Sequence, residues 1–227
     1  ELCCCILRRE YGTDLGWCVD KRVRDTGPFV QGTSYGIHPA VRIYYSPRVM
    51  YWLTGDPSYW KEGNVKRKKP REGDVPEGGM IIKEMFTPPA SLYAELEALM
   101  QQTNYSEKQC DALYEELLTD IISGWAVMVK AGSGSKDGWF WAGVNAAKEN
   151  QSIADAVIAQ LDNYEHIQTS GFGQSVCLRC HASADRDFTF IAENNIEGFS
   201  EDKNLLGFFR DNSWRDSSYL NKYPLNK

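Results

Sequence analysis

The chain carries one motif with a specific chemistry, Cys177-Leu178-Arg179-Cys180-His181. Two thiols separated by two residues and followed at once by an imidazole are the pattern for covalent attachment of a c-type haem. Each thiol can add across a vinyl group of the macrocycle, which leaves the neutral imidazole of His181 to bind the iron. The spacing therefore predicts a protein with one covalent haem c and His181 as the proximal iron ligand.

Two other uses of the same side chains stay open. The three groups could bind zinc, or the two thiols could form a disulfide. A zinc site usually has four ligands, and the sequence offers no fourth ligand at a compatible spacing. The remaining histidines are His38 and His166, and the other cysteines lie at Cys110 or within the first eighteen residues. Haem attachment is therefore the favoured interpretation.

The second axial position of such an iron has few candidates. His38 precedes Pro39 in a glycine-rich stretch, where a single histidine is more often structural than a ligand. Four methionines lie in apolar runs and are better explained as core: Met50, Met80, Met85 and Met128. We therefore predict a five-coordinate, high-spin ferric haem.

Composition limits the classes of partner. The formal net charge is -6, and 42% of the residues are hydrophobic, so the chain is globular and nucleic acid is not expected as a partner. The one basic run, Lys66–Arg71, lies between glycines and indicates a solvated loop, although it could dock an acidic redox partner. No apolar run approaches the ~20 residues that span a bilayer.

Haem c is attached outside the cytoplasm, so the motif predicts an exported protein, periplasmic or extracellular. The sequence begins at Glu1 and shows no signal peptide, which favours a mature or truncated form. An oxidising compartment permits disulfides among the other five cysteines, which are Cys3, Cys4, Cys5, Cys18 and Cys110. Because five is odd, at least one thiol stays unpaired within the chain, and the pairing stays open.

The elements that must position the motif can be placed by pattern. Residues 1–36 indicate an irregular Cys-rich arm, 37–200 the haem domain and 201–227 a polar tail. Strands are expected over 40–45, 80–86, 125–130 and 139–144, the last two joined by a glycine-rich hairpin loop. A short helix is expected behind Ser46 as N-cap, and a longer one from the capping box at Ser106 to near Gly124. A third helix is expected over 152–161. The pattern predicts an α+β fold, mainly an antiparallel sheet with flanking helices.

Three motifs in order resemble the cytochrome P-460 family of monohaem c-type proteins, over roughly residues 38–196. They are the Gly-Gly-Met-Ile-Ile-Lys-Glu run at Gly78–Glu84, the Trp-Ala-Val-Met-Val-Lys run at Trp125–Lys130 with its hairpin, and Cys-x-x-Cys-His-Ala-Ser-Ala at Cys177–Ala184. The resemblance implies an antiparallel β fold around a five-coordinate haem, in bacterial exported proteins that are commonly dimeric.

The resemblance also implies site residues and two activities. P-460 proteins proper carry a lysine joined to the porphyrin edge and oxidise hydroxylamine, whereas the related cytochromes c′-β bind nitric oxide in an apolar distal pocket. Lys83 matches the cross-linking lysine, with Lys130 as the competing match. Arg42 is similar to a pocket arginine of the family.

Strand alternation separates two candidates of the second strand. Lys83 should share a face with Ile81 and Met85, whereas Glu84 should lie on the opposite face. Both cannot line one flat pocket wall unless a bulge intervenes, so Lys83 is kept as the site residue. Glu84 is expected to be a surface or paired carboxylate rather than a proton acceptor.

Three functions follow from these observations. The first is an oxidoreductase that acts on a small nitrogen compound such as hydroxylamine at an open iron site. The second is an electron-transfer or nitric-oxide-binding cytochrome, and the third is a structural haem module of a larger extracellular assembly. The partners expected are a small nitrogen-containing ligand or substrate and a redox protein.

Overall fold

The structure is a computed structural model. The model describes residues 5–6, 8–24, 29–30, 33–34, 40–55, 73–86, 93, 96, 98–100, 102–133, 137–146, 167–172, 177, 181–182, 184, 187, 189, 191 and 196–197, with the backbone alone at 29–30, 33–34, 107 and 167–172.

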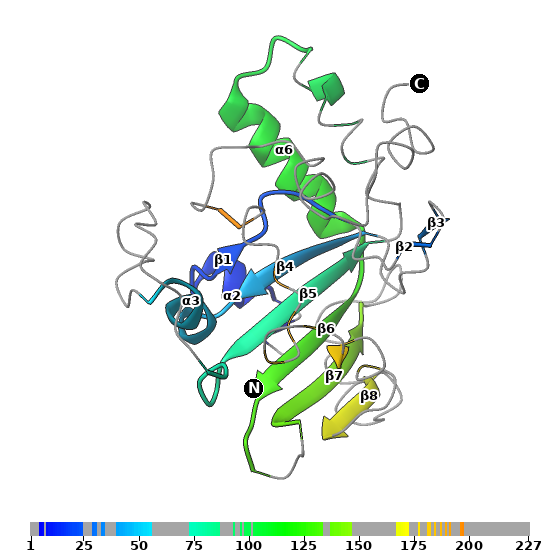
Figure 1. Ribbon diagram of the computed structural model, residues 1–227. Coiled ribbons are helices and arrows are strands. Elements are labelled where there is room, and N and C mark those ends of the chain that lie inside the picture. Colours follow the sequence, from blue (N-terminus) through cyan, green and yellow to red (C-terminus); the bar gives the residue numbers. More distant parts are fainter. Residues whose placement is uncertain are drawn as a thin grey trace.

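One antiparallel sheet of six strands organises the described residues, in the order β1-β4-β5-β6-β7-β8 (Figure 1). Its strands are β1 (Cys18–Val19), β4 (Val41–Tyr45), β5 (Met80–Phe86), β6 (Ile122–Lys130), β7 (Trp139–Asn145) and β8 (Ile167–Phe172). A separate ribbon pairs β2 (Phe29–Val30) with β3 (Thr33–Ser34). The four strands predicted from sequence are all present, and the β6–β7 hairpin is confirmed. The fold is therefore α+β in class, as predicted.

The register divides the sheet into two faces. Tyr45, Ile81, Met128 and Trp141 are opposite one another across four neighbouring strands, so they share one face, which we call the tryptophan face. Arg42, Glu84, Trp125 and Val144 are likewise in register on the other face, the arginine face. The two faces bury separate groups of side chains.

Helix α3 (Pro47–Thr54) packs on the tryptophan face. Its start is as predicted, with Ser46 as N-cap and Pro47 in the first turn, where the missing N–H of proline has no cost. The Ser46 hydroxyl accepts a hydrogen bond from the Met80 amide at 2.8 Å rather than from its own helix. Helix α3 buries four apolar side chains: Val49, Met50, Trp52 and Leu53.

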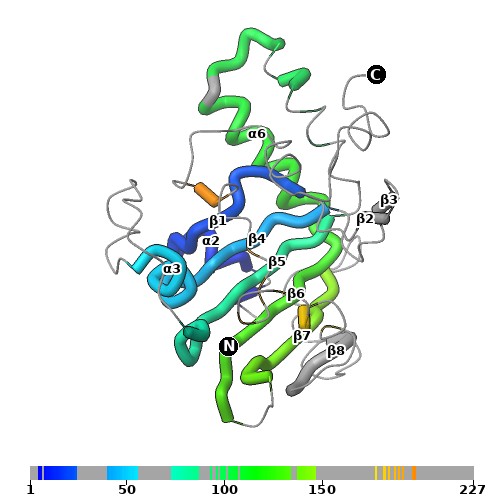
Figure 2. The backbone as a smooth tube through the Cα atoms, viewed as in Figure 1, coloured from blue at the N-terminus to red at the C-terminus, as the bar shows by residue number. Residues whose placement is uncertain are grey.

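The N-terminal residues lie on the arginine face. Ile6, Tyr11 and Val19 are buried in one cluster with Tyr44 and other residues of the sheet. Strand β1 pairs with the edge of β4, and the N-terminal segment runs beside the sheet in Figure 2. Helix α2 (Glu10–Thr13) is part of this segment. The described part of the predicted arm thus shares its core with the sheet.

Helix α6 (Glu107–Asp120) begins with the predicted capping box. The Ser106 amide donates to the Gln109 side chain at 2.9 Å. The helix ends at Asp120 and β6 begins at Ile122, so the prediction that it runs to near Gly124 is wrong. Gly124 is a strand residue, where a Cβ would lie 2.6 Å from the carbonyl oxygen of Val144; close contact with β7 requires glycine there.

Several predictions fall outside the described residues. These are the helix over 152–161, the polar tail at 201–227, the basic run Lys66–Arg71 and the position of His38. No helix in the described ranges is both long enough and apolar enough to cross a membrane.

Candidate functional site

Cys177 and His181 both contact the tryptophan face. Cys177 packs against the buried cluster of that face, and the imidazole of His181 meets the indole of Trp141 edge to face, with ring centroids 4.8 Å apart at 61°. Both residues therefore contact side chains of the same sheet face. The thiol and the imidazole can contact one ligand there. Cys180 lies outside the described residues.

The hairpin between β6 and β7 holds Trp141 in place. The Trp141 indole N–H donates to Oδ2 of Asp137 at 3.0 Å, and the backbone N–H of Trp139 donates to Oδ1 at 3.1 Å. Gly138 between them has φ +72°, a conformation that favours glycine. The hairpin thus fixes Asp137, and Asp137 in turn fixes the indole of Trp141.

Asp187 follows His181 in the sequence and is hydrogen-bonded to residues of the sheet. Its carboxylate accepts from Nζ of Lys130 at 2.7 and 2.9 Å, from the indole N–H of Trp139 at 3.3 Å and from the Val75 amide at 2.7 Å. Asp187 has φ +43°, which costs free energy that surrounding contacts must offset. These bonds hold the residue six positions after His181 to the end of the tryptophan face.

Lys83 lies on the same face as Trp141. It is opposite Ile43 on β4 and Ala126 on β6, and Ala126 is opposite Gly143 on β7. Trp141 lies two strands across from Lys83, at about 4.8 Å a strand, and two residues along, at about 3.4 Å a residue. Because these directions are perpendicular, the two Cα atoms are roughly 12 Å apart. The sheet therefore places Lys83 and the contact point of His181 on one wall.

The row through Lys83 suits a flat apolar group. Ala126 and Gly143 are among the smallest residues, and both are half-buried, as is Lys83. In the neighbouring row Ile81, Met128 and Trp141 are buried. Small side chains allow a planar ring system to approach the backbone closely. Together with a thiol and an imidazole on the same face, this row fits a covalently held haem.

Lys130, the competing lysine, also belongs to the tryptophan face, but at its end. Its side chain is 9% exposed and its partner Asp187 is 4% exposed. Its ammonium also lies 5.1 Å from the centre of the Trp139 ring. These contacts give Lys130 a structural role in holding Asp187.

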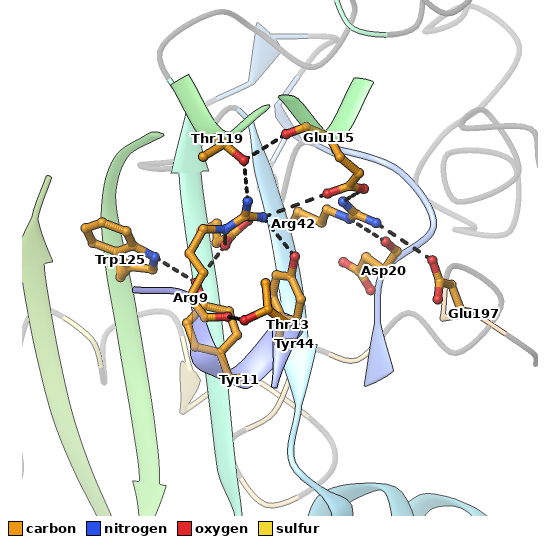
Figure 3. A network of polar contacts seen from close by, with 11 residues as sticks. Arg9, Tyr11, Thr13, Asp20, Arg42, Tyr44, Glu115, Thr119, Trp125 and Glu197 are labelled. Carbon is orange, nitrogen blue, oxygen red and sulfur yellow. Dashed lines mark hydrogen bonds and ion pairs between the residues drawn. The ribbon is translucent and has the colours of Figure 1, made fainter. Parts of the chain in front are cut away.

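Arg42 is on the arginine face, so the structure does not bring it together with Lys83 or His181. It donates to the carbonyl oxygen of Asp20 at 2.9 Å and to the Glu115 carboxylate of α6, and it lies 3.7 Å from Glu197. Burial alone would lower the pKa of Arg42, but Tyr44 and Glu115 outweigh it and raise the pKa. Figure 3 shows Arg42 among the polar side chains of the arginine face, which form a connected network of hydrogen bonds and ion pairs.

Glu84 is buried at the centre of the same network, on the face opposite Lys83 as predicted. Arg9 donates to its two oxygens at 2.6 and 3.0 Å, and the Tyr11 hydroxyl donates at 2.6 Å. The prediction of a paired carboxylate is confirmed, and the surface alternative is wrong because Glu84 is fully buried. Arg9 and Tyr11 gave no sequence signal, because a partner 75 or 73 positions away leaves no local pattern.

The described cysteines outside the motif form no disulfide. Cys5, Cys18 and Cys110 are each present as thiols, while Cys3 and Cys4 lie outside the described residues. Burial, reinforced by Glu197, raises the pKa of Cys18 to about 12. A thiol with so high a pKa is unreactive at neutral pH.

In the part of the chain that the structure describes, no three His, Cys, Asp or Glu side chains gather as a metal-ion site. The zinc alternative therefore gains no ligand set there. No family model, curated protein or solved structure matches the chain. The P-460 resemblance accordingly rests on the three sequence motifs alone.

Proposed function

We propose that this chain is an exported monohaem c-type cytochrome of the P-460 type, which oxidises a small nitrogen compound such as hydroxylamine. The observation that carries the proposal is that one sheet face holds both Lys83 and the Trp141 contact of His181. The two residues that the motifs assign to the haem lie far apart in sequence. Because they share one face of the sheet, both can contact one haem.

Each residue has a distinct role in this proposal. The thiols of Cys177 and Cys180 hold the haem covalently, and the imidazole of His181 binds its iron. When bound, the haem would supply an iron that exchanges electrons with a small nitrogen species. Ala126 and Gly143 leave room beside the sheet, and Asp187 keeps the attachment segment docked.

Lys83 has the role that separates the two activities within the family. Its neighbours on the tryptophan face include Ile43, Ile81 and Met85, so its stem leaves the sheet among apolar side chains. The family resemblance predicts a covalent bond from its Nζ to the porphyrin edge. Hydroxylamine oxidation is expected with that bond.

The arginine face contributes no acid or base to this chemistry. Arg42 and Glu84 are both held in the network on the far side of the sheet. On the tryptophan face, Asp137 and Asp187 accept hydrogen bonds from tryptophan N–H groups, and Asp20 accepts from Arg24 and Tyr45. Because these three carboxylates are held by donors, protons released on oxidation are expected to leave through water.

Nitric-oxide binding without catalysis is the second candidate, and the apolar character of the tryptophan face favours it. Ile43, Ile81 and Met128 are buried there, and an apolar wall stabilises a neutral diatomic ligand. Such a protein would exchange electrons with a redox partner or store the gas. Its Lys83 would be free of the porphyrin.

The test is hydroxylamine-dependent reduction of an artificial electron acceptor by the haem-loaded chain, with peptide mass mapping. The proposal expects turnover and a Cys177–Cys180 haem peptide joined to the Lys83 peptide. Lys83→Met should abolish turnover, whereas Lys130→Met, the matched control, should lower stability and leave the cross-link intact. A free Lys83 peptide with no turnover, together with nitric-oxide binding, would favour the second candidate.

A further inference from the structure

The contact between His181 and Trp141 fixes the ring orientation of the histidine, which its own side-chain torsion leaves open. Rotation about χ2 of histidine is broad and has no sharp rotamer wells. An iron-bound imidazole therefore needs a neighbour to choose its ring plane. In this chain Trp141 lies against the ring at 4.8 Å and is itself buried, with 2% exposed.

Trp141 is held by more than packing. Its χ2 is also broad, but its indole N–H donates to Asp137 four residues earlier. Asp137 is fixed in turn by the Trp139 amide, a local side-chain-to-backbone bond two residues on. The hairpin, the aspartate, the indole and the imidazole thus form one continuous chain of contacts.

The neighbouring tryptophan shows that this arrangement is specific. Trp139 is equally buried on the same face, but its indole N–H donates to Asp187. One indole of β7 therefore holds the segment that follows the histidine, and the other meets the histidine ring. A leucine at either position would fill the core without making these bonds.

We propose that Asp137 and Trp141 are positioning residues for His181, which set the orientation of the imidazole presented to the haem iron. This inference rests on the proposed function, in which His181 is the proximal ligand. It adds that the hairpin, far from the attachment motif in sequence, controls the iron–imidazole bond.

The experiment is resonance Raman spectroscopy of the ferrous haem-loaded chain, which reports the iron–imidazole stretching band directly. Trp141→Leu should shift and broaden this band, because the ring then samples several planes. Trp141→Phe, which keeps an aromatic neighbour but loses the N–H, should give a smaller change. Asp137→Ala should change the band in the same direction, and as a half-buried residue it tests the inference if Trp141→Leu fails to fold.

Trp125→Leu is the matched control. Trp125 is also buried and donates its indole N–H, to Tyr11, but on the arginine face. It should lower the unfolding midpoint and leave the iron–imidazole band unchanged. If Trp141→Leu and Asp137→Ala carry covalent haem and show the wild-type iron–imidazole band, this inference is overturned and the proposed function still stands. A wild-type chain that carries no covalent haem would overturn the proposed function and this inference together.

Discussion

Lys83 and Arg42 lie on neighbouring strands but on opposite faces of the sheet, because Lys83 is opposite Ile43, and Arg42 is opposite Glu84. One face can contact a haem attached at Cys177 and Cys180, and the other carries a buried polar network. The two residues that the family resemblance assigns to one pocket therefore have different roles in this chain. Their substitutions should have different consequences.

Arg42→Leu should lower the free energy of unfolding by about 2 kcal/mol, because it leaves the Asp20 carbonyl and Glu115 without their charged donor. The haem absorption spectrum should not change. Urea unfolding followed by circular dichroism measures the first effect and a visible spectrum the second. An altered haem coordination in Arg42→Leu would contradict the assignment of this residue to the arginine face.

The pair formed by Lys130 and Asp187 should behave as a buried ion pair. Asp187→Asn leaves the ammonium of Lys130, which is 9% exposed, with the weaker counter-charge of the exposed Asp74 at 3.9 Å, at a cost of about 3 kcal/mol. Adding Lys130→Met should restore part of that loss, because the stranded charge is removed. A double-mutant cycle in urea measures the coupling, and strictly additive losses would show that the two groups do not interact.

The small row beside Lys83 should control haem loading. Ala126→Leu puts a larger side chain between Lys83 and Gly143, and we expect covalent haem content to fall several-fold. Ala142→Leu places the same side chain on the arginine face, where overpacking costs about 1–3 kcal/mol, without affecting loading. The ratio of haem absorbance to protein mass measures both. Equal loading of the two variants would show that the row does not contact the haem.

Cys18 should resist alkylation in the folded protein. With a pKa of about 12, its thiolate fraction at pH 8 is on the order of 1 in 10,000, whereas an unfolded thiol with a pKa near 8.5 is ionised to roughly a quarter. The rate should therefore rise steeply as pH is raised, and far more on unfolding. Peptide-resolved mass spectrometry after a short iodoacetamide pulse measures this. Equally fast labelling of folded and unfolded chain would contradict the burial of Cys18.

The strands could be predicted from sequence because their signals are local. Alternation over Met80–Phe86 was enough to separate Lys83 from Glu84, and the glycines before Trp139 marked the hairpin. The helix end near Gly124 was predicted wrongly, because glycine can end a helix or admit a neighbouring strand, and only the pairing with β7 decides between them.

The supports of the site had no local signal. Asp187 meets Lys130 across 57 residues, and Arg9 meets Glu84 across 75. Such pairs are set by the topology of the sheet, which the sequence of one segment does not encode. The bond from Trp141 to Asp137 is the exception, since the two residues are four positions apart, but nothing in their spacing pointed to His181.

The most direct test of the account is whether the haem is covalent. The chain should be produced in a bacterial host that attaches haem c during export, and then treated with acid-acetone and weighed intact by mass spectrometry. The account predicts that the colour stays with the protein and that the mass rises by that of one haem, with both gains lost when Cys177 and Cys180 are replaced by alanine. A colourless chain of unmodified mass, or haem extracted into the solvent, would contradict it.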